Sequence, residues 1–320
     1  MNNKLQVLLI ASIGANILLL SSVYAINKKI NSAANKNNAS VQQETTPVVN
    51  KTAQSATQID KQKIFNETNP ASGFDLKIKY GSLGPKMISF GVIDPVKFKG
   101  VFTQSNGPLT QENEGILDNG SDENIKITLD NSRFLLNFFW AVGLANKTKI
   151  LTEGDMVKYG GEKDLGNFAS TGGWTLSKGN AMQYYSKASL IPLTPKQEEL
   201  VNSVASNIYR PCCNNSTAFP DCNHGMALLG ILELMAANNK TEKEMYEAAK
   251  YFNAFWFPGN YYDLAVYFKN KENKNFADID PKIILSKEYS SATGSKNAKA
   301  WLVNQGIVQE PPKSGNGCGV

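Results

Sequence analysis

Residues 5–26, LQVLLIASIGANILLLSSVYAI, contain no charged residue, and this run is the feature that most limits what the chain can fold into. A run of about 20 apolar residues is long enough to cross the hydrocarbon core of a bilayer as one helix. Lys4 precedes the run, and Lys28 and Lys29 follow it. We therefore expect residues 1–26 to be a transmembrane anchor or a signal segment, with the rest of the chain exported.

The sequence leaves open whether this segment is cleaved. The sequence VYA at residues 23–25 resembles the small-residue pattern of a signal cleavage site, and cleavage would make the protein secreted. The length of the run favours an uncleaved anchor, because the apolar region of a signal peptide has about 7–15 residues. In both cases we expect an extracytoplasmic location, at the cell surface or in the periplasm. The membrane is the expected partner of residues 5–26.

The tract that follows, residues 27–66, is rich in Asn, Ser, Thr, Gln, Ala and Lys and has little apolar periodicity. Such a composition buries too little apolar surface to offset the entropy that ordering costs. We expect this tract to be a disordered linker that holds a folded part away from the membrane. The net charge is +5, but the lysines form no dense stripe interleaved with aromatic residues, so nucleic-acid binding is not expected.

We predict an α+β fold in which residues 67–190 form a β-rich part. Apolar and polar residues alternate with period two in FDLKIKYG (74–81) and in NIKITL (124–129), which is typical of half-buried strands. The segment MISFGVIDPVKFKGVF (87–102) is interpreted as two short strands separated by an Asp-Pro pair. The run FLLNFFWAVGLAN (134–146) is apolar on nearly all sides, which predicts one buried helix within this part.

Residues 191–310 are predicted to form a bundle of three to four helices. A capping box at Thr194 begins the first helix, which ends near Arg210 because a proline follows. The second helix begins near His224 and is apolar on almost every side, which predicts a central buried helix. A capping box at Thr241 begins the third helix, and a short fourth helix follows it.

The first two of these helices are joined within YRPCCNNSTAFPDCNHGMALLG (209–230), which holds three of the four cysteines and the only histidine. Cys212 and Cys213 follow the end of one helix, and Cys222 and His224 fall at the start of the next. Antiparallel packing of the two helices would bring both ends of the loop together. The partial positive charge of a helix N-terminus also stabilises a nearby thiolate. We therefore predict that these four side chains converge on one point.

Three uses of this site stay open at the level of sequence. Three sulfurs and an imidazole form a tetrahedral set suited to Zn(II), and thiolates also suit Cu(I), with a metal-donor protein as partner. Alternatively, Cys212, Cys213 and Cys222 are catalytic in thiol–disulfide exchange with a thiol protein. In the third interpretation they form structural disulfides in a non-catalytic binding or structural module at the cell surface. Cys318, in an expected flexible tail at 311–320, is a possible fourth thiol.

The loop and its flanking helices resemble a known arrangement. Residues 194–257 are similar to the thiol-containing domain of the CcmH-type cytochrome c maturation proteins, which has a helix, a Leu-Arg-Cys-x-x-Cys loop and two further helices. Tyr209-Arg210 stands where that family has Leu-Arg, and Cys212-Cys213 replaces its two-residue cysteine spacing. The loop also resembles that of exported bacterial proteins with a Pro-Cys-x-Cys sequence. The resemblance implies a three-helix fold here and a thiol or haem-maturation role.

Overall fold

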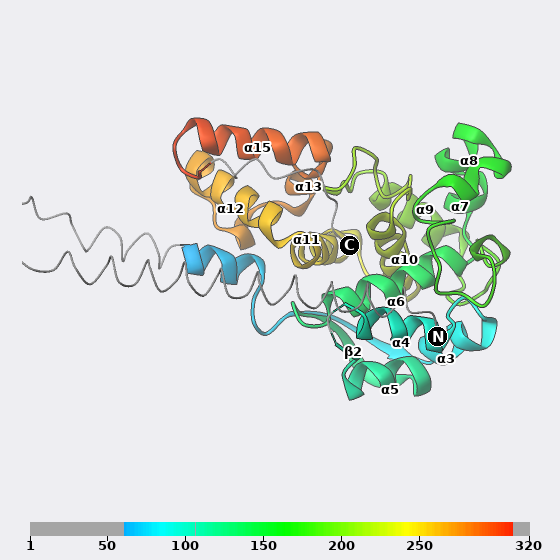
Figure 1. Cartoon of the computed structure of the whole chain (residues 1–320). Coiled ribbons are helices and arrows are strands. Elements are labelled where there is room, and N and C mark those ends of the chain that lie inside the picture. Colours follow the sequence, from blue (N-terminus) through cyan, green and yellow to red (C-terminus); the bar gives the residue numbers. More distant parts are fainter. Residues whose placement is uncertain (1–60, 106, 310–320) are drawn as a thin grey trace, which may run out of the picture. The chain divides into compact units, whose positions relative to one another are not determined.

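The structure is a computed structural model, and it describes residues 61–105 and 107–309 of the 320-residue chain. This part of the chain is mostly helical (Figure 1). The expected anchor or signal segment at 1–26, most of the linker, and the tail at 311–320 with Cys318 lie outside the described residues. Within the described part, no helix is both long enough and apolar enough to cross a membrane.

The described residues contain one small sheet. Its two strands, β1 (Phe74–Gly81) and β2 (Ser121–Ile127), pair antiparallel, with Phe74 opposite Ile127. β1 coincides with the predicted segment at 74–81, and β2 overlaps the segment predicted at 124–129 over residues 124–127. Leu76, Ile78 and Tyr80 of β1 are buried in the core. The prediction of an α+β fold with a β-rich part over residues 67–190 is nevertheless wrong, because the rest of this region is helical or irregular.

The segment interpreted as two strands, residues 87–102, lies in two helices instead, α3 (Leu83–Phe90) and α4 (Pro95–Thr103). The Asp-Pro pair between them starts a helix. The Asp94 carboxylate is the N-cap of α4 and accepts hydrogen bonds from the two backbone N–H groups of Val96 and Lys97. Proline suits the first helical position because its missing N–H would have no partner there. The same pair of residues is therefore compatible with a turn between strands and with a helix start.

Helices make up most of the remaining described chain. The prediction of three to four helices for residues 191–310 is too low, because the structure has more helices than this over residues 191–309. Residues 61–68 are helical, and short 3-10 turns cover Glu162–Asn167, Ala181–Gln183 and Phe276–Asp278. The other helices are α5 (Gln111–Asn119), α6 (Ser132–Ala145), α7 (Lys149–Glu153), α8 (Asp155–Gly160), α9 (Pro195–Ala205), α10 (Asn223–Ala237), α11 (Glu242–Trp256), α12 (Pro258–Glu272), α13 (Pro281–Ile284), α14 (Lys287–Ser290) and α15 (Ala292–Asn304).

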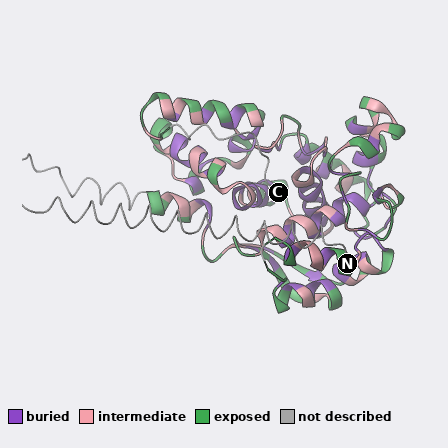
Figure 2. Ribbon diagram, in the orientation of Figure 1, coloured by how far each residue is buried: buried purple, intermediate pink, exposed green. Residues whose placement is uncertain are grey.

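Helix α10 is the buried central helix that the sequence predicts (Figure 2). It packs against α6, α9 and α11. Its approach to α6 is close because both helices carry a glycine at the contact: a Cβ on Gly143 would lie 2.0 Å from the Met226 carbonyl oxygen, and one on Gly230 would lie 2.9 Å from the Phe139 carbonyl oxygen. This packing fixes the N-terminus of α10, where the candidate site lies.

Helix α10 also carries a buried carboxyl group, that of Glu233. Its Oε2 accepts a hydrogen bond from Asn146 Nδ2 at 2.9 Å, and its Oε1 has no hydrogen-bond partner within the described chain. Burial raises the pKa of Glu233 from 4.5 to about 8. Between these two pH values the native state binds more protons than the unfolded chain, so Glu233 lowers stability increasingly as pH rises through this window.

We expect Glu233→Gln to increase the free energy of unfolding at pH 7.5 by about 2–4 kcal/mol, because one pKa unit corresponds to about 1.4 kcal/mol. At pH 3 the substitution should change stability little, since the glutamic acid is then protonated in both states. Urea denaturation at the two pH values measures the difference. An equal effect at both would contradict a buried, protonated Glu233.

Candidate functional site

The cysteine loop between α9 and α10 is attached to the last helices of the described chain. The backbone N–H of Tyr209 donates to the Leu285 carbonyl oxygen at 2.8 Å, just before the loop. Within the loop, the Cys213 carbonyl oxygen accepts a hydrogen bond from the N–H of Ala292, also at 2.8 Å. These bonds hold an irregular segment in place on the folded part, so the positions of its cysteines are defined by more than the two flanking helices.

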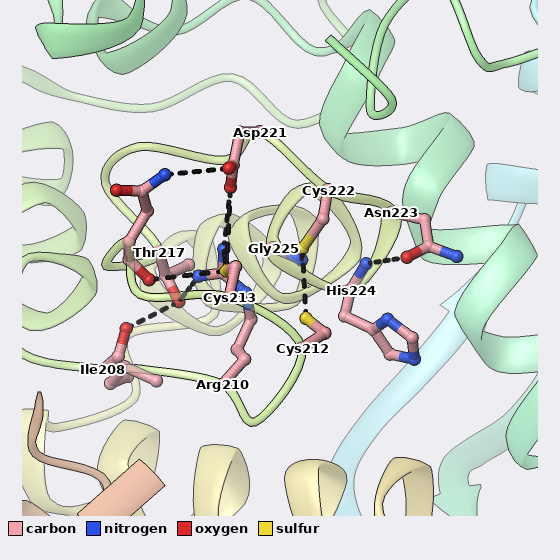
Figure 3. A network of polar contacts seen from close by, with 11 residues as sticks. Ile208, Arg210, Cys212, Cys213, Thr217, Asp221, Cys222, Asn223, His224 and Gly225 are labelled. Carbon is pink, nitrogen blue, oxygen red and sulfur yellow. Dashed lines mark hydrogen bonds and ion pairs between the residues drawn. The ribbon is translucent and has the colours of Figure 1, made fainter. Parts of the chain in front are cut away.

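The structure brings the sulfur atoms of Cys212, Cys213 and Cys222 together (Figure 3). The three Sγ atoms all lie within 4.8 Å of one another, and those of Cys212 and Cys222 are 3.4 Å apart. All three residues are half-buried, and none is in a disulfide. Two sulfurs on one tetrahedral Zn(II) are about 3.8 Å apart, given Zn–S bonds of about 2.3 Å. The spacing of the three sulfurs is therefore compatible with a shared metal ion.

Cys222 is the N-cap of α10, and its Sγ accepts a hydrogen bond from the backbone N–H of Gly225 at 3.3 Å. Hydrogen bonds from Cys212 and Cys213, with the nearby charge of Arg210, hold the pKa of Cys222 well below its usual range. Hydrogen bonding with Cys213 and Cys222, together with burial, raises the pKa of Cys212. Cys222 is therefore the residue of the cluster that forms a thiolate most readily.

Arg210 places a buried positive charge beside the sulfurs, and its side chain is 0% exposed. Its Nη2 donates to Cys213 Sγ at 3.0 Å and to Asp221 Oδ1 at 3.2 Å, and its Nη1 donates to Thr217 Oγ1 at 3.3 Å (Figure 3). Gly225 leaves room for the guanidinium, since a Cβ there would lie 2.7 Å from Nη2. The guanidinium is thus fixed where it stabilises thiolates of the cluster.

Arg210 and Asp221 are site residues that the cysteine and histidine pattern does not identify. Arg210 lies two residues before Cys212, and Asp221 directly precedes Cys222. One signal was available in the sequence. The chain contains only two arginines among many lysines, and one of these arginines, Arg210, is separated from the paired cysteines by a single proline. Arginine is favoured over lysine where a buried cation must donate several hydrogen bonds in fixed directions.

His224 does not join the three sulfurs, contrary to the expected convergence of four ligands. Its ring points away from the cysteines (Figure 3) and packs against Phe257 and Trp256, with centroid distances of 4.4 and 5.7 Å. Its Nδ1 is buried and has no hydrogen-bond partner in the described part of the chain. The cause is local geometry. Cys222 is the N-cap, with extended backbone, and its Sγ turns back to the Gly225 N–H, whereas His224 lies in the first turn of α10 and faces Phe257.

Substitution of His224 tests this placement. Burial lowers the pKa of His224 to about 4, whereas an unfolded histidine titrates near 6.5. Between these values the unfolded chain binds more protons, so stability is lost as pH falls from 6.5 towards 4. We expect His224→Phe to remove up to about 3 kcal/mol of this pH dependence, measured by urea denaturation at pH 4.5 and 7. Metal affinity should stay within about threefold, and a tenfold loss would instead indicate a ligand.

Comparisons with known proteins provide no match: no family model, no curated protein and no solved structure matches the chain. The resemblance of residues 194–257 to the cytochrome c maturation proteins stays a prediction. The structural feature on which a function can be argued is the group formed by Cys212, Cys213 and Cys222, which can hold a metal ion or be redox-active.

Proposed function

We propose that the protein binds a soft or borderline metal ion, Zn(II) or Cu(I), through Cys212, Cys213 and Cys222. The observation that carries this proposal is the mutual proximity of the three Sγ atoms, all within 4.8 Å of one another. A single disulfide would use two of these sulfurs, whereas a metal ion can use all three. Thiolates are ligands that both Zn(II) and Cu(I) favour.

The surroundings of the sulfurs support a thiolate site. Three thiolates carry a charge of −3, which Zn(II) reduces to −1 and Cu(I) to −2. The buried Arg210 guanidinium, which also pairs with Asp221, places a positive charge beside the remaining negative charge. Nη2 of Arg210 and the N–H of Gly225 both donate to sulfur, at 3.0 and 3.3 Å. Such hydrogen bonds from outside the ligand set orient metal ligands and tune their basicity. The contacts that the cluster already makes are therefore of the kind that a thiolate–metal site uses.

Three sulfur ligands leave one position of a tetrahedral zinc ion free. His224 faces away from this position, and Asp221 is engaged by Arg210 and by Asn215 Nδ2, at 3.2 and 2.8 Å. Zinc sites with three protein ligands use the fourth position for water or substrate. We therefore propose an exchangeable fourth position, which suits transfer of the ion to or from a metal-donor protein. We also propose that the protein is extracytoplasmic, which the uncharged run at residues 5–26 supports.

Metal analysis of the reduced full-length chain tests this function. Purified without oxygen, the protein is expected to bind one Zn(II) or Cu(I) per chain, with a sulfur-dominated first shell in X-ray absorption spectra. A variant with serine at Cys212, Cys213 and Cys222 should bind none. Cys318→Ser is the matched control, because it removes the remaining cysteine outside the loop, and it should keep the stoichiometry. Less than a tenth of an equivalent bound by the unmodified chain would contradict the proposal.

A further inference from the structure

We propose that the metal site is switched off by oxidation, in which Cys212 and Cys222 form a disulfide and the ion is released. This inference rests on the proposed function, whose ion needs both sulfurs as ligands. The two Sγ atoms are 3.4 Å apart, and a disulfide bond has a length of about 2.0 Å. A small displacement of one residue therefore converts two metal ligands into a disulfide, and the single sulfur left at Cys213 does not retain the ion.

The surroundings of the third sulfur favour this pairing over the others. Cys213 Sγ accepts a hydrogen bond from Arg210, and the carbonyl oxygen of Cys213 accepts one from Ala292. These contacts keep Cys213 beside the guanidinium. A disulfide between Cys212 and Cys213 would close a strained ring between adjacent residues. The remaining combination, Cys212 with Cys222, is also the one with its sulfurs in direct contact.

The two partners differ in how firmly the fold holds them. Cys222 caps α10, the central helix, and is fixed by it. Cys212 lies in a segment without helix or strand, directly after Pro211, so a rotation of its side chain can bring its sulfur to Cys222 while the backbone hydrogen bonds on either side stay in place. Both residues keep part of their surface exposed to solvent, and in the proposed switch the oxidant reaches the pair from that side. The movement that forms the disulfide is therefore confined to the loop.

The oxidant is a low-molecular-weight disulfide of the glutathione class. One of the two cysteine thiolates attacks a sulfur of this oxidant, forms a mixed disulfide and expels a thiolate. The other cysteine thiolate then attacks the protein sulfur of the mixed disulfide and expels a second thiolate. Cys212 and Cys222 together lose two electrons, the oxidant gains them as its S–S bond breaks, and the ion leaves as its ligands are consumed.

Titration of the zinc-loaded full-length chain with oxidised glutathione tests the switch. Released zinc is followed with a chromogenic chelator, and disulfides are mapped by mass spectrometry after alkylation of free thiols. We expect one zinc ion released per disulfide between Cys212 and Cys222, with Cys213 alkylated, and recovery of zinc binding after dithiothreitol. A zinc-loaded chain that forms no disulfide between Cys212 and Cys222 would overturn the switch and leave the proposed function intact. Zinc that stays bound while this disulfide forms would contradict both, because these two sulfurs would then not be ligands. A reduced chain that binds no metal at the start would overturn both.

Two variants separate the pairing from the ligand set. Cys213→Ser should form the same disulfide with the same oxidant, although it begins with weaker metal binding. Cys212→Ser should not form this disulfide. A disulfide that contains Cys213 in the unmodified chain, or oxidant-dependent release of zinc that persists in Cys212→Ser, would contradict the proposed pair. Cys318→Ser serves as the control, and in this variant release should be unchanged.

Discussion

Replacement of Arg210 by methionine is expected to destabilise the native state by about 3–5 kcal/mol, the range for loss of one partner of a buried ion pair. The guanidinium is fully buried and donates to Cys213, Thr217 and Asp221. Methionine keeps much of the side-chain volume but removes every donor. The Asp221 carboxylate then loses its ion-pair partner, and the thiolates lose the charge nearest to them.

The same substitution should raise the pKa of Cys222 and weaken metal binding by more than tenfold. Arg210 lowers the pKa of this thiol, although the hydrogen bonds from Cys212 and Cys213 lower it more. The pH profile of alkylation by iodoacetamide, with peptide mapping of Cys222, reports the pKa directly. A purely structural role of Arg210 would change stability and leave this profile in place.

Arg133 provides the matched control, because it is the only other arginine in the sequence. It is half-buried, donates to Ser105 and lies over the Phe102 ring at 5.1 Å. Arg133→Met should cost no more than about 1 kcal/mol, as is usual for partly exposed charges, and should leave alkylation and metal binding unchanged. If both arginine variants lose the same stability, the special role of the buried guanidinium is contradicted.

What could be predicted from the sequence is mainly what neighbouring residues encode. The capping boxes at Thr194 and Thr241 are both present, each with its reciprocal hydrogen bonds. The apolar character of α10 correctly predicts a central buried helix. The alternating segment at 74–81 forms β1, and the one at 124–129 contributes residues 124–127 to β2. In each case a short window contains the physical cause, whether a side-chain cap, a fully apolar surface or a period-two pattern.

The predictions that are wrong depend on information outside such windows. The segment at 87–102 contains Val, Ile and Phe, which suit strands, and its Asp-Pro pair suits a turn as well as a helix start. The packing of the segment against other helices decides for helix. The position of His224 in the sequence groups it with the cysteines, whereas the first turn of α10 directs its ring towards Phe257. The role of Arg210 arises from contacts with Thr217 and Asp221 that only the folded loop creates.

Replacement of Cys222 by serine is expected to reduce metal affinity at least 100-fold, about 2.7 kcal/mol, with little change in the stability of the metal-free chain. Cys222 has two separable roles, as a sulfur ligand and as the N-cap that accepts the Gly225 N–H. Serine is a favourable N-cap, so its hydroxyl oxygen can accept this hydrogen bond. Serine is not a thiolate, so the metal loses a ligand.

Cys222→Ala makes the two roles distinguishable. Alanine removes the ligand and the cap, so this variant should match serine in metal affinity and lose about a further 1 kcal/mol of stability. Competition with a chromogenic chelator measures the affinity, and urea denaturation of the metal-free proteins measures the stability. If the serine variant binds zinc within tenfold of the unmodified chain, Cys222 is not a ligand. Equal stability of the two variants would mean that the sulfur does not cap α10, and the fixed position of Cys222 on which the three-sulfur geometry depends would lose its support.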